Sequence, residues 1–281
     1  MDDQTPEVPY NGRMVVAQLA RFDLAMTADS GQCFRMRMLT PDRCILQAQD
    51  RFVTVTDLGG GSFAFSCEEA EYHGFWADYL DAQTDYDPIH RMARDPYAAQ
   101  AVDFARGMRI LRQQPWETLI CFILSQRRNI PSIRHCVHLL CQRFGQSVGD
   151  GLFAFPSPEA LAAAPIEQLA ACSLGYRTRY VAQTARLVAS GAADLNAWQS
   201  LDDPALENRL LTLPGVGIKV AACVMLFGYY RLNAFPVDIW IDRVIQTQYG
   251  GISPLTRYAP YAGVIQQCLF VYSRHLAKTR S

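Results

Sequence analysis

Lysine is scarce in this sequence, and one of the two lysines stands where an amine could react. The chain has 24 arginines but only Lys219 and Lys278. A guanidinium stays charged at any usable pH, whereas an amine can lose its proton and attack carbon. Lys219 closes the run Leu-Pro-Gly-Val-Gly-Ile-Lys, directly before an apolar helical stretch. The helix dipole and partial burial both disfavour an ammonium there, so we interpret Lys219 as a nucleophile.

A carboxylate follows at a spacing that could return it to the amine. Asp238 stands 19 residues after Lys219, in Phe-Pro-Val-Asp-Ile-Trp, and one apolar helix fits between the two. A carboxylate there could help to deprotonate the amine or stabilise positive charge during bond cleavage. Two simpler interpretations stay open at this point. Lys219 could be a surface lysine that contacts phosphate, and Asp238 could be only a helix N-cap.

The turn before Lys219 is rich in glycine and could bind an anion. Gly215 and Gly217 permit positive φ and close approach of the backbone, so backbone N–H groups can face a phosphate. The helix that starts directly afterwards adds its partial positive charge. Such a site needs no basic side chain, which would let a chain of net charge −1 bind DNA. The simpler alternative is an ordinary tight turn between two packed helices.

Charge is distributed unevenly along the chain. Residues 1–100 hold 16 Asp and Glu against 8 Lys and Arg, whereas residues 101–281 hold 11 against 18. The C-terminal part is therefore expected to meet an anion, although two differently charged solvated surfaces would give the same counts. The first residues lack the features of a signal peptide, and no stretch approaches the roughly 20 apolar residues of a membrane span. The sequence therefore predicts a soluble intracellular protein.

The nine cysteines do not form a recognisable metal site. None belongs to a CxxC pair, and most lie in apolar helical patterns such as ETLICFIL and VAACVML. Buried free thiols are the expected state in a reducing compartment. Zinc or iron–sulfur ligation would require a compact cysteine cluster, which the sequence does not contain.

The elements that must position Lys219 and Asp238 change character along the chain. Residues from about 10 to 70 contain short alternating runs separated by turn signals, which predict an antiparallel sheet with hairpins. From about residue 97 onward, apolar residues recur at helical spacing. We therefore expect an α+β protein: an antiparallel β-sheet domain with flanking helices at residues 1–95, then a mainly α-helical domain at residues 96–281. The last helix is expected at residues 260–277.

The motifs together resemble a known enzyme superfamily. LPGVGIKVAACV followed by FPVD is similar to the helix-hairpin-helix, Gly/Pro-rich, Asp superfamily of DNA glycosylases. The resemblance is closest to the 8-oxoguanine DNA glycosylase family, in which the lysine marks enzymes with both glycosylase and lyase activity. It extends over nearly the whole chain, through SGQCFRMR, FWADYL with DYDP, QQPWETLICFILSQ, LGYRTRY and PYAGVIQQCLF.

The resemblance implies base excision repair by base flipping, with roles for the matching residues. Lys219 would attack C1′ of a flipped nucleotide, form a Schiff base and cause β-elimination, and Asp238 would assist. The carbonyl of Gly31 would accept the N7 hydrogen that distinguishes 8-oxoguanine from guanine. Four-residue spacing places Lys219 with Cys223 and Gln266 with Phe270 on shared helix faces. Gln266 would read the pairing edge of the base, and Phe270 and Cys223 would cover its two faces.

The resemblance also implies contacts with the duplex around the lesion. Tyr176 and Arg177 match residues that wedge into the helix and contact the orphaned base. Further DNA contacts are expected from Arg127, Asn129, Gly215, Gly217 and Trp240. Arg127 and Ser132 replace an asparagine and an arginine of the best-known family pattern, so strict preference for cytosine opposite the lesion is not implied.

Cofactor and partner expectations follow from the same resemblance. No cofactor is required, and the iron–sulfur cluster of endonuclease III relatives is not expected, because only Cys268 follows Asp238. The carbonyls of Leu211, Leu213 and Val216 could hold a structural monovalent cation or calcium ion. The expected partner is double-stranded DNA that contains 8-oxoguanine. We expect a monomer with no membrane contact, in the cytoplasm at a bacterial nucleoid.

Three alternatives to this function remain distinguishable. A monofunctional alkylpurine glycosylase would use the aspartate with water and would lack Lys219. A non-catalytic helix-hairpin-helix DNA-binding module would not need Lys219, Asp238, Cys223, Gln266 and Phe270 together. A metabolic Schiff-base enzyme would show a small-molecule motif or a parallel βαβ pattern, and the sequence shows neither.

Overall fold

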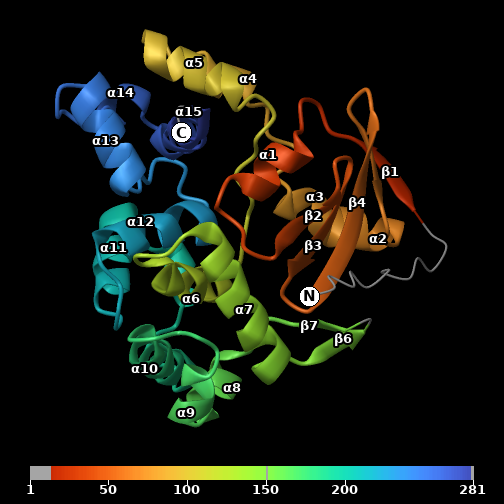
Figure 1. The fold of residues 1–281 in the computed structure, drawn as a ribbon, viewed down its shortest axis with the longest axis vertical. Helices are drawn as coiled ribbons and strands as arrows, with labels where there is room; N and C mark the ends of the chain where they lie inside the picture. The colour runs from red at the N-terminus through yellow and green to blue at the C-terminus, as the bar shows by residue number, and fades with distance from the viewer. Residues whose placement is uncertain (1–13, 150, 280–281) are drawn as a thin grey trace.

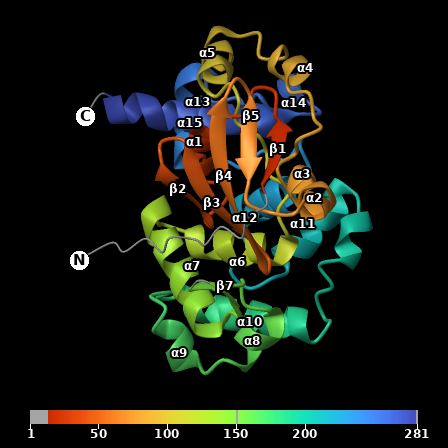
Figure 2. The same ribbon diagram turned by 90° about the vertical axis from the view of Figure 1, so that its right-hand side faces the viewer.

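The N-terminal half is built on one antiparallel sheet. The computed structural model describes residues 14–149 and 151–279, so the first residues of the expected strand region lie outside it. Five strands run in the order β1-β5-β4-β3-β2, and each pairs with its neighbour antiparallel. Their bounds are β1 Val15–Gln18, β2 Met36–Thr40, β3 Arg43–Ala48, β4 Arg51–Gly59 and β5 Ser62–Phe65. Figures 1 and 2 show this sheet beside the helical part.

One face of the sheet is covered by a short helical segment. Val53, Val55 and Phe65 alternate inward from paired strands and are fully buried. Against them pack Trp76 and other residues of the π-helix Tyr72–Trp76 and of α3 Ala77–Tyr79, which follow the largely exposed turn α2 Glu69–Glu71. The expected antiparallel sheet with flanking helices is therefore confirmed.

Helices make up most of the remaining chain. In order they are α1 Leu24–Asp29 within the sheet region, then α4 Asp87–His90, α5 Pro96–Phe104, α6 Pro115–Ser125, α7 Ile130–Phe144, α8 Pro158–Ala163, α9 Ile166–Ala170, α10 Arg177–Ala189, the 3-10 turn Ala197–Ser200, α11 Asp203–Leu211, α12 Ile218–Cys223 with the π-helix Val224–Gly228, α13 Ile239–Gln248, α14 Leu255–Tyr258 and α15 Ala262–Thr279. Side chains of Asp95, Asn129, Ser157 and Asp202 cap four of these helices, each with proline at the first or second helical position.

Two details differ from the expectation for the helical part. A small hairpin, β6 Ser147–Gly149 with β7 Leu152–Phe153, interrupts the helices, and no strand was predicted in this mainly helical part. The last helix runs over 262–279 rather than 260–277. The hairpin is too short to show strand alternation, so periodicity gives no signal for it.

Two buried clusters hold the molecule together. One fills the space between the sheet and the helical segment at residues 69–79. The other lies among the helices and also includes Phe34, Tyr86 and Ile89 from the N-terminal part. The chain thus crosses between the clusters more than once, and the domain boundary after residue 95 stays a prediction. Within residues 14–149 and 151–279, no helix combines the length and apolarity needed to cross a membrane.

Candidate active site

The hairpin before Lys219 joins two helices, α11 and α12. Gly215 has φ +79, and a Cβ there would lie 2.6 Å from the ring of Tyr180, so only glycine fits. Gly217 is the N-cap of α12 with φ −103, a value open to any residue, so the positive φ that glycine permits is not used there. An added Cβ at Gly217 would meet no atom within 4 Å. A side chain at Gly215 would therefore collide with the protein, whereas a side chain at Gly217 would extend into open space.

One cavity brings the predicted catalytic and base-binding residues together. It is small, with a volume of about 50 Å³, and it opens to solvent. Its walls include all six of them: Gly31, Lys219, Cys223, Asp238, Gln266 and Phe270. Four further wall residues were not predicted from the sequence: Phe122, Phe227, Pro236 and Gln267. Helices α12, α13 and α15, the segment after α1 and the end of α6 thus converge on one site.

The amine of Lys219 is partly buried in this cavity. Its Nζ lies 3.3 Å from Ser125 Oγ and 4.9 Å from the centre of the Phe122 ring. The Ser125 hydroxyl donates to the carbonyl of Phe122, so its lone pairs remain available to accept from the amine. Ser125 therefore orients Lys219 from α6. The sequence carried no signal for this contact, because the two residues are 94 positions apart.

Cys223 lies one helical turn after Lys219 and is 3% exposed. Burial raises the pKa of its thiol, and the nearby carboxylate of Asp238 raises it further, whereas Lys219 opposes the shift. The thiol is therefore protonated at neutral pH. Cys223, Lys219 and Asp238 all line the same cavity.

Asp238 both caps a helix and lines the cavity. One carboxylate oxygen, Oδ1, accepts from the backbone N–H of Trp240 at 3.0 Å and of Ile241 at 2.9 Å. The N-cap interpretation is thus correct as far as the hydrogen bonds go, but it does not exclude a chemical role. The start of α13 fixes the carboxylate and favours its negative charge.

Gln266 has an unused acceptor on the cavity wall. The residue is 3% exposed, and its Nε2 donates to the carbonyl of Pro236 at 3.0 Å. A carbonyl can only accept, so the amide nitrogen must face Pro236. Among the described residues, the buried Oε1 has no hydrogen-bond partner. A buried acceptor without a partner is costly, and this one belongs to a residue that lines the cavity.

Gly31 and Phe270 form a narrow part of the cavity wall. Gly31 has φ +77, and a Cβ there would lie 3.5 Å from Phe270 Cε1 and 3.0 Å from Ile130 Cδ1. Any larger residue would therefore be strained and would narrow the space beside the phenyl ring.

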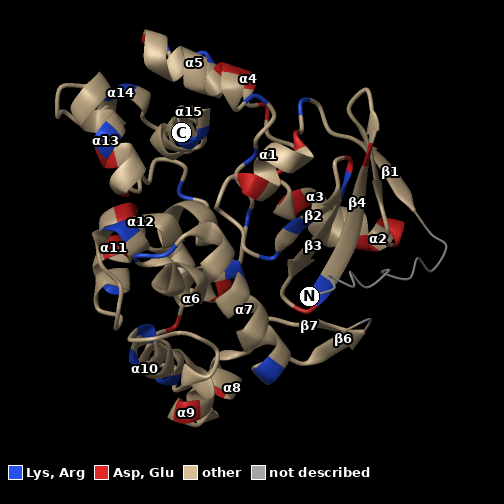
Figure 3. Ribbon diagram, viewed as in Figure 1, with Lys and Arg blue, Asp and Glu red and all other residues tan. Residues whose placement is uncertain are grey.

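The residues predicted to contact the duplex have different surroundings. Tyr176 is 54% exposed, and Arg127 is exposed with φ +50. Asn129 caps α7 by accepting from the N–H of Ser132. Arg177 is only 4% exposed, donates to the carbonyls of Leu174 and Gln126, and stacks over the Tyr176 ring. Trp240 is half-buried beside Arg243. Basic segments on α7, α10 and α13 appear in Figure 3.

Side-chain metal ligands do not gather anywhere in the described part of the chain. No three His, Cys, Asp or Glu residues there lie close enough to hold an ion. The nine cysteines are all buried and form no disulfide.

Comparison with known proteins places this geometry in a family. Residues 14–119 match the family "8-oxoguanine DNA glycosylase, N-terminal domain", and residues 120–256 match "HhH-GPD superfamily base excision DNA repair protein". A solved structure of MBOgg1 in complex with a low affinity DNA ligand is 32% identical, with a TM-score of 0.90 over 95% of this chain and 97% of that one. The chain belongs to the 8-oxoguanine DNA glycosylase family. The Clostridium acetobutylicum 8-oxoguanine glycosylase/lyase in its apo-form is 31% identical, with a TM-score of 0.87 over 92% of this chain and 96% of that one.

A curated relative matches over a shorter region. The N-glycosylase/DNA lyase of Saccharomyces cerevisiae is 35% identical over 159 residues, which cover 51% of this chain but only 42% of the yeast protein. Relatives with this kind of name also come from an archaeon and a plant, so the comparisons do not support the expected bacterial source.

Proposed function

We propose that this protein is a DNA glycosylase with lyase activity that excises 8-oxoguanine from duplex DNA. The observation that carries the proposal is one cavity that holds an amine, a capped carboxylate and a buried acceptor without a partner. Support also comes from the relatives: the Clostridium acetobutylicum enzyme is an 8-oxoguanine glycosylase/lyase with a structure on double-stranded DNA that contains cytosine opposite 8-oxoguanine.

Lys219 would act as the nucleophile on a nucleotide flipped out of the helix. Its unprotonated Nζ forms a bond to C1′ while the bond from C1′ to N9 breaks, and the base leaves and takes up a proton. Opening of the sugar gives an imine between Nζ and C1′. Loss of a proton from C2′ then expels the 3′ phosphate, and water releases the lysine. Asp238, fixed by two N–H groups, would stabilise the positive charge that develops at the sugar.

Recognition of the base would use the other walls of the cavity. The Gly31 carbonyl would accept from N7–H of 8-oxoguanine, a hydrogen that guanine lacks. The Oε1 of Gln266 would accept from an N–H on the pairing edge, which gives this buried oxygen the partner it lacks. Phe270 would stack on one face of the base, and the protonated thiol of Cys223 would cover the other.

The duplex would be held by the hairpin and by residues beside the cavity. Gly217 leaves the first N–H groups of α12 without a side-chain cap, so they can face a phosphate. Tyr176, Arg127, Asn129 and Trp240 would contact the strands around the lesion. Arg177 would contact the orphaned base with the free edge of the guanidinium that stacks on Tyr176. Alternatively, it would first give up its hydrogen bond to the Leu174 carbonyl.

A structural cation at the hairpin remains part of the proposal. The carbonyls of Leu211, Leu213 and Val216 would hold a monovalent cation or calcium ion. The Leu213 carbonyl already accepts from the N–H of Val216 at 3.1 Å, and a carbonyl keeps a second lone pair for an ion. Such an ion would stabilise the turn and take no part in the reaction.

Borohydride trapping tests the proposed function directly. The substrate is duplex DNA with a single 8-oxoguanine, and the readout is a covalent protein–DNA adduct. We expect an adduct that disappears in Lys219→Gln and persists in Lys278→Gln, the matched control at the second lysine of the chain. Base release without an adduct would instead indicate a monofunctional glycosylase. Binding with neither outcome would indicate a non-catalytic DNA-binding module.

A further inference from the structure

The end of helix α1 is held by side chains from two other helices. The last carbonyls of a helix have no partner within it and need one elsewhere. Here the carbonyl of Ala28 accepts from Arg134 Nη2 at 2.6 Å, that of Asp29 from Arg274 Nη1 at 3.0 Å, and that of Ser30 from Gln267 Nε2 at 2.7 Å. Arg134 lies on α7, whereas Gln267 and Arg274 lie on α15. Three consecutive carbonyls directly before Gly31 are thus fixed by distant residues.

The residue that follows has little freedom to move. Gly31 has φ +77 and lies between Ile130 of α7 and Phe270 of α15, the same two helices that hold the preceding carbonyls. The Ser30 carbonyl and the Gly31 N–H belong to one peptide plane. A hydrogen bond to the Ser30 carbonyl therefore fixes the peptide plane between Ser30 and Gly31. The backbone dihedrals of Gly31 then set the direction of its own carbonyl relative to that plane.

The amide nitrogen of Gln267 is engaged in this contact. Gln267 is 3% exposed and lines the cavity beside Gln266. The two adjacent glutamines donate to different segments: Gln266 to Pro236 before α13, and Gln267 to Ser30 after α1. Gln266 keeps a buried acceptor without a partner, whereas the amide of Gln267 holds the opposite segment in place.

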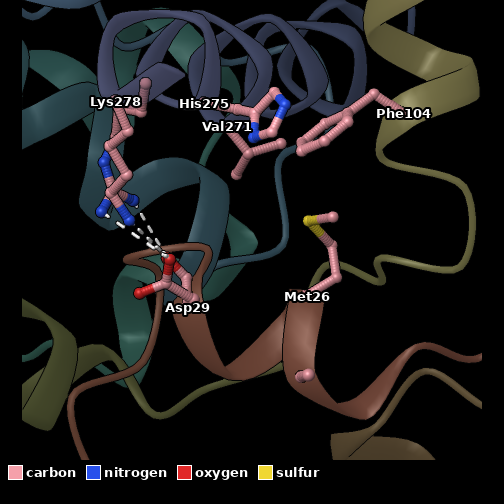
Figure 4. Close-up of a pocket in the computed structure, with 8 residues that line it drawn as sticks. Met26, Asp29, Phe104, Val271, His275 and Lys278 are labelled. Atoms are coloured by element: carbon pink, nitrogen blue, oxygen red, sulfur yellow. Dashed lines mark hydrogen bonds and ion pairs between the residues drawn. The ribbon is translucent and has the colours of Figure 1, made fainter. Parts of the chain in front are cut away.

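Arg274 connects the same segment to the aromatic wall. Its guanidinium lies 5.3 Å from the centre of the Phe270 ring, one helical turn earlier, and its Nη2 lies 3.9 Å from a carboxylate oxygen of Asp29. Figure 4 shows this side of α15, where Lys278 also reaches Asp29. These two residues line a cavity together with Met26, Phe104, Val271 and His275. Arg274 thus contacts both Phe270 and the residues before Gly31, outside the catalytic cavity.

We propose that Gln267 and Arg274 are positioning residues that orient the Gly31 carbonyl and set its distance from Phe270, and so determine how well the protein distinguishes 8-oxoguanine from guanine. This inference rests on the proposed function, in which that carbonyl reads N7–H. The distinction depends on one hydrogen bond, and a hydrogen bond weakens steeply when its angle is poor. If the peptide plane between Ser30 and Gly31 could rotate freely, the protein would therefore distinguish 8-oxoguanine from guanine less well, although Lys219 and Asp238 would stay in place.

Two substrates separate this role from a merely structural one. Excision from a duplex with 8-oxoguanine opposite cytosine requires the base to be bound. Strand cleavage at a preformed abasic site in the same duplex requires only Lys219, Asp238 and the DNA contacts. We expect Gln267→Met, which keeps the side-chain length but has no donor, to slow single-turnover excision by about 10- to 100-fold. Cleavage at the abasic site should change by less than about threefold.

The second variant and its controls use the same helix. Arg274→Met should also reduce excision selectively, and Arg274→Lys, which keeps a charged donor, should restore part of it. Lys278→Met removes an exposed ion pair to the same Asp29 and should leave both activities unchanged. In a Lys219→Gln background, Gln267→Met should bring the ratio of the dissociation constants for guanine and 8-oxoguanine duplexes closer to one.

The possible outcomes are distinct. Excision lost with abasic cleavage retained supports the inference, through either Gln267→Met or Arg274→Met if one of them does not fold. Both activities retained, or both reduced equally in folded variants, would overturn it. If the unmodified protein releases no 8-oxoguanine, the proposed function itself is wrong and the inference falls with it.

Discussion

Helices α12 and α13 both begin at the catalytic cavity, but they begin in different ways. The start of α12 has Gly217 as its N-cap and no side-chain hydrogen bond, and a Cβ there would meet only open space. The start of α13 is closed by Asp238, whose Oδ1 accepts from two of its N–H groups. One helix start thus has no side-chain cap, whereas the other is capped by its own carboxylate. Under the proposed function, the uncapped start would bind a phosphate and the capping carboxylate would assist the reaction.

The largest effect is expected from removing the negative charge of Asp238, which caps the start of α13. Asp238→Asn keeps a good N-cap but cannot stabilise positive charge, so single-turnover excision of 8-oxoguanine should fall about 10²- to 10³-fold. The midpoint of thermal unfolding and the affinity for duplex DNA should change little. Asp242→Asn, in the first turn of the same helix, is the matched control. Parallel losses of stability, affinity and rate would reduce Asp238 to a structural cap.

The next largest effect is expected on the stability of the hairpin before α12, at Gly215. Gly215→Ala introduces a Cβ at φ +79 and 2.6 Å from the Tyr180 ring, so the free energy of unfolding should decrease by about 1–3 kcal/mol. Gly217→Ser is the control, because its φ of −103 and its open surroundings accept a side chain. Chemical denaturation of both variants measures the difference. Equal stability of the two would mean that the hairpin relaxes around Gly215.

Adding a side-chain cap at the start of α12 should affect DNA binding rather than folding. Gly217→Asp would give α12 the same kind of cap that α13 has and place a carboxylate where a phosphate is proposed to lie. We expect unchanged or slightly higher thermal stability, together with an affinity for duplex DNA that is about tenfold weaker. Gly217→Asn, a neutral cap of the same shape, should retain more affinity. If both variants bind DNA normally, this helix start does not contact phosphate.

The smallest effect is expected at the thiol beside the amine. Burial raises the pKa of Cys223 above its usual value of about 9, so the thiol stays protonated from about pH 6 to about pH 8. Cys223→Ser should therefore leave the shape of the excision profile unchanged over that range. Because the folded pKa is the higher one, stability gained by keeping this thiol neutral is present below about pH 9 and is lost as the pH rises further. If the excision rate of Cys223→Ser changed differently with pH on the alkaline side, the thiolate of Cys223 would take part in the reaction.

Much of the architecture could be predicted because the relevant signals are local, whereas the residues that line the cavity were implied by the family resemblance. Alternating runs predicted the strands, and the spacing of four residues placed Lys219 with Cys223 and Gln266 with Phe270 on their helices. The β6–β7 hairpin was not predicted, and the sequence left open which of the two glycines, Gly215 or Gly217, adopts positive φ. In both cases the deciding contacts involve too few residues to leave a periodic pattern.

The sequence by itself determined which reactive groups exist and which of them share a helix face. Only the tertiary structure decided that Ser125 orients the amine, that the amide of Gln266 is turned so that its oxygen lacks a partner, and that Gln267 holds Ser30. The physical reason is separation along the chain: Gln267 and Ser30 are 237 residues apart. Helical periodicity reports which side of its own helix a residue occupies, and it carries no information about the distant segment that packs against that side.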